Sequence, residues 1–189
     1  MKLQTSDLKY ALNVAKKSIK KGSTNREIIR VIHFECKDKV LTIAGVDGFR
    51  GNFLKLNVDT DEEFAFNIEH FDVPNYAGQT VCISKVEDRI EFDFDTVLIR
   101  KENIELSTVI GYPTIEKLTS EKKPVFKIAF NPKYIKEALS VLPKYNDCVV
   151  FEFYGSTSPG IIKVQNELLK SDVRLILPVR SDETAEYIL

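Results

Sequence analysis

Asp47 and Arg50 are the residues of this sequence whose types and spacing first suggest chemistry. They lie in the glycine-containing stretch AGVDGFRGNFLKL, residues 44–56, between two strand-like runs. A carboxylate and a guanidinium three residues apart can act on a substrate, bind a ligand through charge-assisted hydrogen bonds, or hold a turn together. The local sequence leaves all three interpretations open, so the choice among them depends on the rest of the sequence.

Signatures of catalysis are absent from the rest of the sequence. It contains no G-x-x-x-x-G-K-[ST], G-x-S-x-G or H-E-x-x-H motif, and no G-x-G-x-x-G after a strand. His33 lies within a strand pattern and His70 near a short predicted helix, and neither has neighbours that would complete a triad or a metal site. The alternating carboxylates of EFDFD, residues 91–95, fit a solvated strand face. We therefore expect no enzyme, no cofactor and no metal.

The composition is that of an ordinary globular protein. The chain has 189 residues and a formal net charge of −1, with 43% hydrophobic and 29% charged residues. The three cysteines, Cys36, Cys82 and Cys148, are odd in number and far apart, which argues against a disulfide framework or a zinc site. No apolar run is long enough to cross a bilayer, and the start MKLQTSDLKY has no apolar signal core. These features predict a cytoplasmic protein.

Helical and strand periodicities divide the chain into three similar units, near residues 1–58, 59–117 and 118–189. In the first, residues 6–20 form an amphipathic helix with Ser6 as its N-cap, and three strands follow. In the second, a strand leads to a short helix cut at Pro74, and three strands follow. In the third, Asn131 caps a helix that has Pro132 at its first position. Repeated strand-helix-three-strand units predict an α+β fold with antiparallel sheets and helices on one side.

Lysines gather on the helix faces that lie opposite the apolar positions. They are Lys9, Lys16, Lys17, Lys20 and Lys21 in the first unit, and Lys133, Lys136 and Lys144 in the third. Acidic residues concentrate in strands and turns instead. A basic helix layer of this kind suits phosphate contact by one side of a near-neutral protein. An ordinary solvated helix face explains the same lysines without any ligand.

Four segments, in order along the chain, resemble segments of bacterial DNA polymerase III β subunits, the sliding clamps. AGVDGFRG, residues 44–51, resembles the A-T-D-G-x-R loop of the clamp's middle domain, and VIGYPTIEKL, residues 109–118, resembles the segment that links this domain to the last one. FKIAFNPKYIKEAL, residues 126–139, is similar to a helix of the last domain, and LILPVR, residues 175–180, is similar to the clamp's C-terminus. The resemblance implies the DNA-clamp, or processivity, fold.

The match covers only part of a clamp. The resemblance implies that residues 1–117 form a complete clamp-like domain of two units, and that residues 118–189 form half of another with a C-terminal tail. An unpaired sheet flank of the third unit would then invite self-association or be covered by the chain's own tail.

In the family, the loop, the linker and the terminus converge on a groove that captures short hydrophobic peptides. The resemblance implies that the matching residues of this chain line such a groove: Ile29, Val46, Gly48, Phe49, Arg50, Gly51, Pro113, Leu118, Asn131, Tyr134, Leu177, Pro178, Val179 and Arg180. The family usually carries a bulky apolar residue where Gly51 stands. The tail residues 187–189, Tyr-Ile-Leu, could fold back into the groove as a built-in ligand. A plain turn held by Asp47 and Arg50 remains the alternative.

The resemblance implies a non-enzymatic replication or repair protein, a processivity factor that assembles as an oligomer. Its partners would be DNA polymerase or other clamp-binding proteins, held through short hydrophobic peptides, and duplex DNA, held through its phosphates by the lysines. The alternative is an adaptor or decoy that binds clamp partners without encircling DNA. Glu69 and Asp72 favour this alternative, because they fall where a pore-lining helix should be basic.

Overall fold

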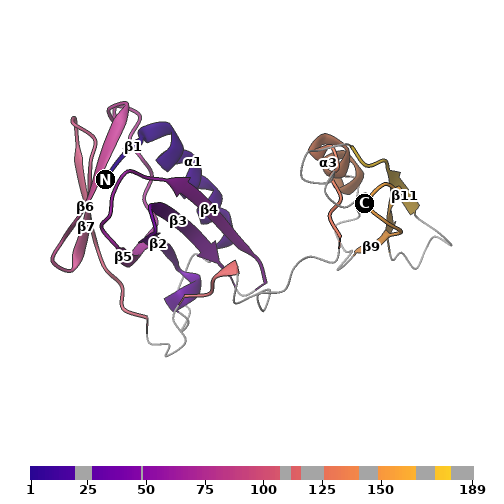
Figure 1. Cartoon of the computed structure of the whole chain (residues 1–189), viewed down its shortest axis with the longest axis horizontal. Helices are drawn as coiled ribbons and strands as arrows, with labels where there is room; N and C mark the ends of the chain where they lie inside the picture. The colour runs from indigo at the N-terminus through magenta and orange to yellow at the C-terminus, as the bar shows by residue number, and fades with distance from the viewer. Residues whose placement is uncertain are drawn as a thin grey trace. The chain divides into compact units, whose positions relative to one another are not determined.

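The computed structural model describes residues 1–19, 27–47, 49–106, 112–115, 126–140, 149–164 and 173–179. The chain forms two compact units, Met1–Ser120 and Glu121–Leu189, and each is considered by itself (Figure 1). Among the residues described, no helix has both the length and the apolar character that crossing a membrane requires.

Unit 1 contains two four-stranded sheets, ordered β4-β3-β2-β5 and β1-β6-β7-β8. The elements of the first repeat are β1 Lys2–Gln4, α1 Thr5–Ala15, η1 Lys16–Ser18, η2 Glu27–Ile29, β2 Val31–Lys37, β3 Val40–Val46 and β4 Gly51–Asn57. Those of the second are β5 Phe64–Glu69, β6 Thr80–Val86, β7 Arg89–Asp93 and β8 Leu98–Glu102. All pairings within the two sheets are antiparallel.

The two repeats of unit 1 exchange their first strands. β1 of the first repeat pairs with β6 of the second, with Leu3 opposite Val81. β5 of the second repeat pairs with β2 of the first, with Ile68 opposite Ile32. Each repeat therefore closes the sheet edge of the other, and the two share one core.

That core lies between α1 and the inner faces of both sheets. The aromatic rings of Phe34 and Phe71 pack against Phe92, with centroids 5.7 and 4.8 Å from it. The end of α1 also comes so close to β3 that a Cβ on Gly45 would lie 2.3 Å from the carbonyl oxygen of Ala15. Only glycine permits this approach, which brings the helix down onto the strand next to the β3–β4 loop. The predicted apolar face of the helix is accordingly buried at Leu8, Ala11, Leu12 and Ala15.

Two local predictions in unit 1 are wrong. Gln4, not Ser6, is the N-cap residue of α1, and the Ser6 hydroxyl donates instead to Asp7 Oδ1 at 3.4 Å. No helix forms over residues 70–79. Phe71 and Val73 are buried there, 8% and 7% exposed, and their two-residue spacing suits an extended chain rather than a helix.

Unit 2 contains helix α3, Pro132–Ser140, and a three-stranded sheet ordered β11-β10-β9. Its strands are β9 Val149–Phe153, β10 Gly160–Val164 and β11 Val173–Ile176. The predicted cap is confirmed, since the backbone N–H of Lys133 donates to Asn131 Oδ1 at 2.9 Å. The strand expected before this helix is not formed over residues 126–130, where the carbonyl of Ala129 accepts a hydrogen bond of 2.8 Å from Val179 N–H.

Candidate functional site

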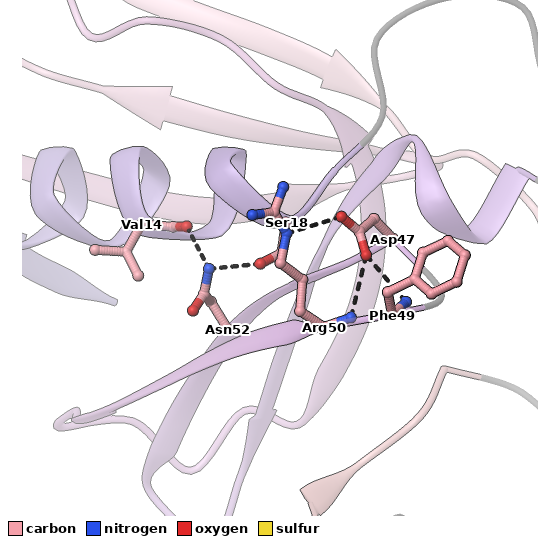
Figure 2. A network of polar contacts seen from close by, with 6 residues as sticks. All are labelled: Val14, Ser18, Asp47, Phe49, Arg50 and Asn52. Atoms are coloured by element: carbon pink, nitrogen blue, oxygen red, sulfur yellow. Dashed lines mark hydrogen bonds and ion pairs between the residues drawn. The ribbon is translucent and has the colours of Figure 1, made fainter. Parts of the chain in front are cut away.

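The loop between β3 and β4 is built around the carboxylate of Asp47. Oδ1 of Asp47 accepts hydrogen bonds from the backbone N–H groups of Phe49 and Arg50, at 3.0 and 3.1 Å (Figure 2). Oδ2 pairs with Nε of Arg50 at 2.9 Å, and the backbone N–H of Asp47 donates to the carbonyl of Arg50 at 3.1 Å. Four contacts therefore tie the two ends of the loop together, so the turn-stabilising contact between Asp47 and Arg50 is present.

These contacts also fix the charges in the loop. The backbone N–H of Phe49, and then the side chain and N–H of Arg50, hold the pKa of Asp47 below its usual range against the opposing effect of burial. The Asp47 side chain is 10% exposed, whereas that of Arg50 is 68% exposed. The Asp47 carboxylate is thus buried within the loop, and the Arg50 guanidinium is exposed to solvent.

Asn52, at the start of β4, anchors this loop to the helix layer. Its side-chain Nδ2 donates to the carbonyl of Val14 at 3.0 Å and to Oγ of Ser18 at 2.6 Å (Figure 2). Ser18 is 1% exposed, so these bonds satisfy polar atoms at the buried end of the helix. Because side chains alternate along a strand, Gly51 and Phe53 face the opposite side of the sheet.

An aromatic stack covers that opposite, outer face. The ring of Tyr112 lies on the imidazole of His33, with centroids 4.3 Å apart and planes 7° from parallel. The His33 Nδ1 and Asn67 Oδ1 share a hydrogen bond of 2.8 Å, and burial lowers the pKa of His33. Burial also raises the pKa of Tyr112, which packs in a small core with Val31, Ala44 and Val46. Tyr112 is thereby docked onto the sheet.

A groove of about 470 Å³ lies between the outer sheet face and the segment 113–115. Phe53, Pro113 and Ile115 contribute apolar walls, while Glu35 and Lys55 contribute charge. A Cβ on Gly51 would lie 2.7 Å from Cε2 of Phe53, so the phenylalanine ring fills the space beside the glycine. Gly51, where the family usually carries a bulky apolar residue, therefore lies beside an aromatic wall and not beside a gap.

The expected groove residues of unit 1 divide into supporting and exposed ones. Ile29 and Val46 are 6% and 7% exposed, so they pack beneath the surface. Phe49 is 91% exposed, and its neighbours Arg50 and Gly51 are also exposed. Pro113 lines the outer-face groove described above. Gly48 and Leu118 lie outside the described residues. Tyr112, His33 and Phe53 were not expected at the site, although the tyrosine falls within the linker segment that carries the family resemblance.

The expected residues of unit 2 are mostly exposed. Tyr134 is 51%, Leu177 63% and Val179 41% exposed, and Pro178 is half-buried. Oδ1 of Asn131 caps α3 by accepting the hydrogen bond from Lys133 N–H, and this bond fixes the orientation of the Asn131 amide group. Arg180 and the tail residues 181–189 lie outside the described part of the chain.

Three of the lysines expected to meet phosphates have protein partners. Lys16 Nζ pairs with Asp72 at 2.8 Å, and Lys9 Nζ donates to the side chain of Asn75 at 3.3 Å. Lys133 Nζ lies 3.9 Å from Glu137. Lys17 and Lys136 are exposed, whereas Lys20, Lys21 and Lys144 lie outside the described residues. The non-helical segment 70–79 therefore brings an acid to Lys16 of η1, directly after α1.

Comparisons with known proteins bear on the fold. No protein-family model and no curated protein matches the chain. Among solved structures, a protein described as a DNA polymerase III β subunit from Eubacterium rectale has a TM-score of 0.73 and 14% identity, over 94% of this chain and 50% of that one. The DNA polymerase sliding clamp of Bacillus subtilis has a TM-score of 0.71 and 18% identity, over 95% of this chain and 49% of that one.

A DNA polymerase III β chain from Streptococcus pneumoniae matches at a TM-score of 0.69 and 17% identity, over 95% of this chain and 49% of that one. The chain thus spans about half the length of the solved structures it matches. The predicted α+β architecture of antiparallel sheets is confirmed, and the chain has the fold of the bacterial DNA polymerase III β sliding clamp.

Proposed function

We propose that this chain is a non-catalytic, sliding-clamp-like protein that captures short apolar peptides of polymerases and other replication or repair proteins and contacts duplex DNA through its phosphates. In this proposal, residues 1–117 are a complete clamp-like domain and residues 118–189 are half of another. The observation that carries the proposal is Phe49, an aromatic residue 91% exposed on a loop whose backbone is held by Asp47. An aromatic anchor on a pre-ordered loop binds a partner with little loss of conformational entropy.

Other described surfaces of the chain have the chemistry to hold an extended peptide. The outer-face groove combines apolar walls at Phe53, Pro113 and Ile115 with charged residues at its rim, which is the usual chemistry of a specific binding site. Arg50 offers hydrogen-bond donors to peptide carbonyls beside the anchor. Considered by itself, unit 2 exposes the side chains of Tyr134, Leu177 and Val179, which are groups of the same chemical kind.

Phe49 provides the direct test. Labelled ten-residue peptides with apolar residues at alternate positions would be titrated and followed by fluorescence polarisation, with serine-substituted peptides as the ligand control. Burying a phenylalanine on binding is worth about 1.5–3 kcal/mol, so Phe49→Ala should weaken binding roughly 10- to 100-fold. Tyr76→Ala is the matched control, because Tyr76 is also an exposed aromatic of unit 1, 70% exposed, but lies outside the β3–β4 loop. Equal affinities of the two variants would contradict the proposal.

A second candidate is an adaptor that binds such peptides and leaves DNA alone. The ion pair between Lys16 and Asp72 favours it, because a lysine already paired with a carboxylate is a weaker phosphate ligand. Retention on circular duplex DNA at several salt concentrations separates the candidates. A clamp that contacts DNA should show binding that falls steeply with salt, by about 0.9 logarithmic units per phosphate contact per decade. An adaptor should bind peptides normally and show no retention at physiological salt.

A further inference from the structure

The inner face of the unit 2 sheet is much less covered than that of unit 1. Phe151 and Phe153 of β9 are 43% and 40% exposed, although their rings face the same side as the buried Ile162 of β10. In unit 1, the inward residues Ile32 and Phe34 of β2 are both 0% exposed. Helix α3 likewise has no buried residue, whereas α1 buries four. Among the described residues, unit 2 therefore has the sheet and helix of a clamp repeat but only part of a core.

Unit 1 shows what completes such a repeat. There, the outer edge of β2 is paired with β5, and the outer edge of β6 is paired with β1. In both cases the added strand comes from the other repeat, together with the apolar side chains that close the core. In the described part of unit 2, β9 is the edge strand in the corresponding place, paired only with β10. Such an edge is a template for another strand.

Unit 2 also carries a segment suited to fill an edge of this kind. Phe126, Ile128 and Phe130 alternate with Lys127 and Ala129, which is the pattern of a strand with one apolar face. Phe130 lies two residues before the first residue of α3, just as the core residue Leu3 of β1 lies two residues before that of α1. The segment 126–130 is thus in the sequence position from which the repeats of unit 1 exchange their first strands.

Within one chain this segment forms no strand, but it already contacts β9 through its aromatic rings. The centroids of Phe126 and Phe130 lie 6.2 and 6.0 Å from that of Phe153. The same ring contacts can be made with the Phe153 of a second copy, with backbone hydrogen bonds to its β9 in addition. Exchange of an identical element between two copies in this way costs few contacts, because those lost within each chain are regained between the chains.

We propose that two copies of this chain associate through unit 2 by reciprocal strand exchange. Segment 126–130 of each copy pairs antiparallel with β9 of the other, and the two α3–sheet layers close one shared core. Pairing Ile128 with Phe151 puts Phe126 opposite Phe153 on the inner face and the oppositely charged Lys127 and Glu152 opposite each other on the outer face. The contact is self-complementary, as twofold symmetry requires, and it stands independently of the proposed peptide binding.

Solution mass over a wide range of concentration, measured by light scattering on the full chain, tests this proposal first. We expect a dimer that dissociates on dilution. Ile128→Glu should shift the chain to monomer, because it puts a charge into the shared core. Ala129→Glu is the matched control: it places the same carboxylate one residue away on the outward face, opposite Val150 and not opposite Glu152, and should leave a dimer. A monomer at every concentration, or equal effects of the two variants, would overturn the proposal.

Cross-linking tests the pairing itself and does not depend on how well Ile128→Glu folds. Chains carrying Lys127→Cys would be mixed with chains carrying Glu152→Cys at low concentration, where the dimers dissociate. The mixture would then be concentrated, so that mixed dimers form, and oxidised. We expect disulfide-linked dimers from the mixture in far higher yield than from either variant alone, where the introduced cysteine faces Glu152 or Lys127 of the other copy and has no cysteine opposite it. A light-scattering dimer without this mixed cross-link would place the contact elsewhere and refute the strand exchange.

Discussion

Replacing Asn52 by alanine removes both hydrogen bonds that hold the start of β4 to the end of the first helix. The carbonyl of Val14 and the hydroxyl of Ser18 then lose the donor that lies 3.0 and 2.6 Å away. Ser18 is 1% exposed, so water cannot readily replace that donor. At a net worth of about 0.5–1.5 kcal/mol for each hydrogen bond, the two together predict a loss of about 1–3 kcal/mol in the free energy of unfolding.

Urea denaturation followed by circular dichroism measures this loss as a lower midpoint with an unchanged slope. Asn57→Ala is the matched control, since Asn57 is an exposed asparagine in the same strand, and it should change the free energy of unfolding by less than about 0.5 kcal/mol. Asn52→Asp keeps the size of the side chain but removes the amide donor, so it should destabilise at least as much as Asn52→Ala. If Asn52→Ala were no more destabilising than Asn57→Ala, the anchoring role assigned to Asn52 would be refuted.

Three further predictions concern the core, the outer face and the basic face. Phe92→Ala should lower the free energy of unfolding by about 3–5 kcal/mol in the same urea assay, because Phe92 is 0% exposed between two aromatic neighbours. Burial lowers the pKa of His33 in the folded state. The neutral side chain therefore contributes fully to the free energy of unfolding above its unfolded pKa of about 6.5, and this contribution is lost as the pH falls toward the folded pKa. His33→Gln should therefore show a weaker fall in stability than the wild type between neutral and mildly acidic pH. If the chain binds duplex DNA, Lys9→Gln with Lys17→Gln should reduce the salt dependence of binding by up to about 1.8 logarithmic units per decade, and an unchanged slope would exclude both lysines as phosphate contacts.

Strong periodicity made the long elements predictable. The apolar spacing of residues 6–20 located the first helix, although it ends at Ala15 and continues only as the short η1 turn. Asn131 and Pro132 identified the start of α3 because capping is a local interaction between near neighbours. The repeat pattern indicated antiparallel sheets for the same reason, since each hairpin is local in sequence.

Long-range pairing accounts for most of what the sequence did not reveal. β1 is only three residues long and is stabilised by β6, nearly 80 residues away, so no local pattern marks it. The repeat pattern predicts a short helix over residues 70–79, but Pro74 and Gly78 are poor helix formers, and burial of Phe71 and Val73 in the shared core favours an extended chain there. In both places the conformation depends on contacts with residues far away in the sequence.

The site was predictable where one motif contains its own interactions. Asp47 and Arg50 contact each other across three residues, so the turn could be inferred from the sequence alone. The stack of Tyr112 on His33 joins residues far apart in the chain, and neither residue type by itself predicts such a contact. Burial of Val46 likewise depends on Tyr112, so its supporting role could be assigned only from the fold.

Amide chemical shifts of the isotope-labelled chain, recorded during titration with an apolar peptide from the panel, test the proposed peptide binding residue by residue. We expect saturable shifts at Phe49, Arg50 and Gly51 and along the groove beside Phe53, with the β6–β7 hairpin unchanged. We also expect these shifts to be lost in Phe49→Ala but retained in Tyr76→Ala. Saturable binding whose shifts leave the β3–β4 loop unchanged, or no binding by any peptide of the panel, would contradict the claim that this loop is a peptide-binding wall.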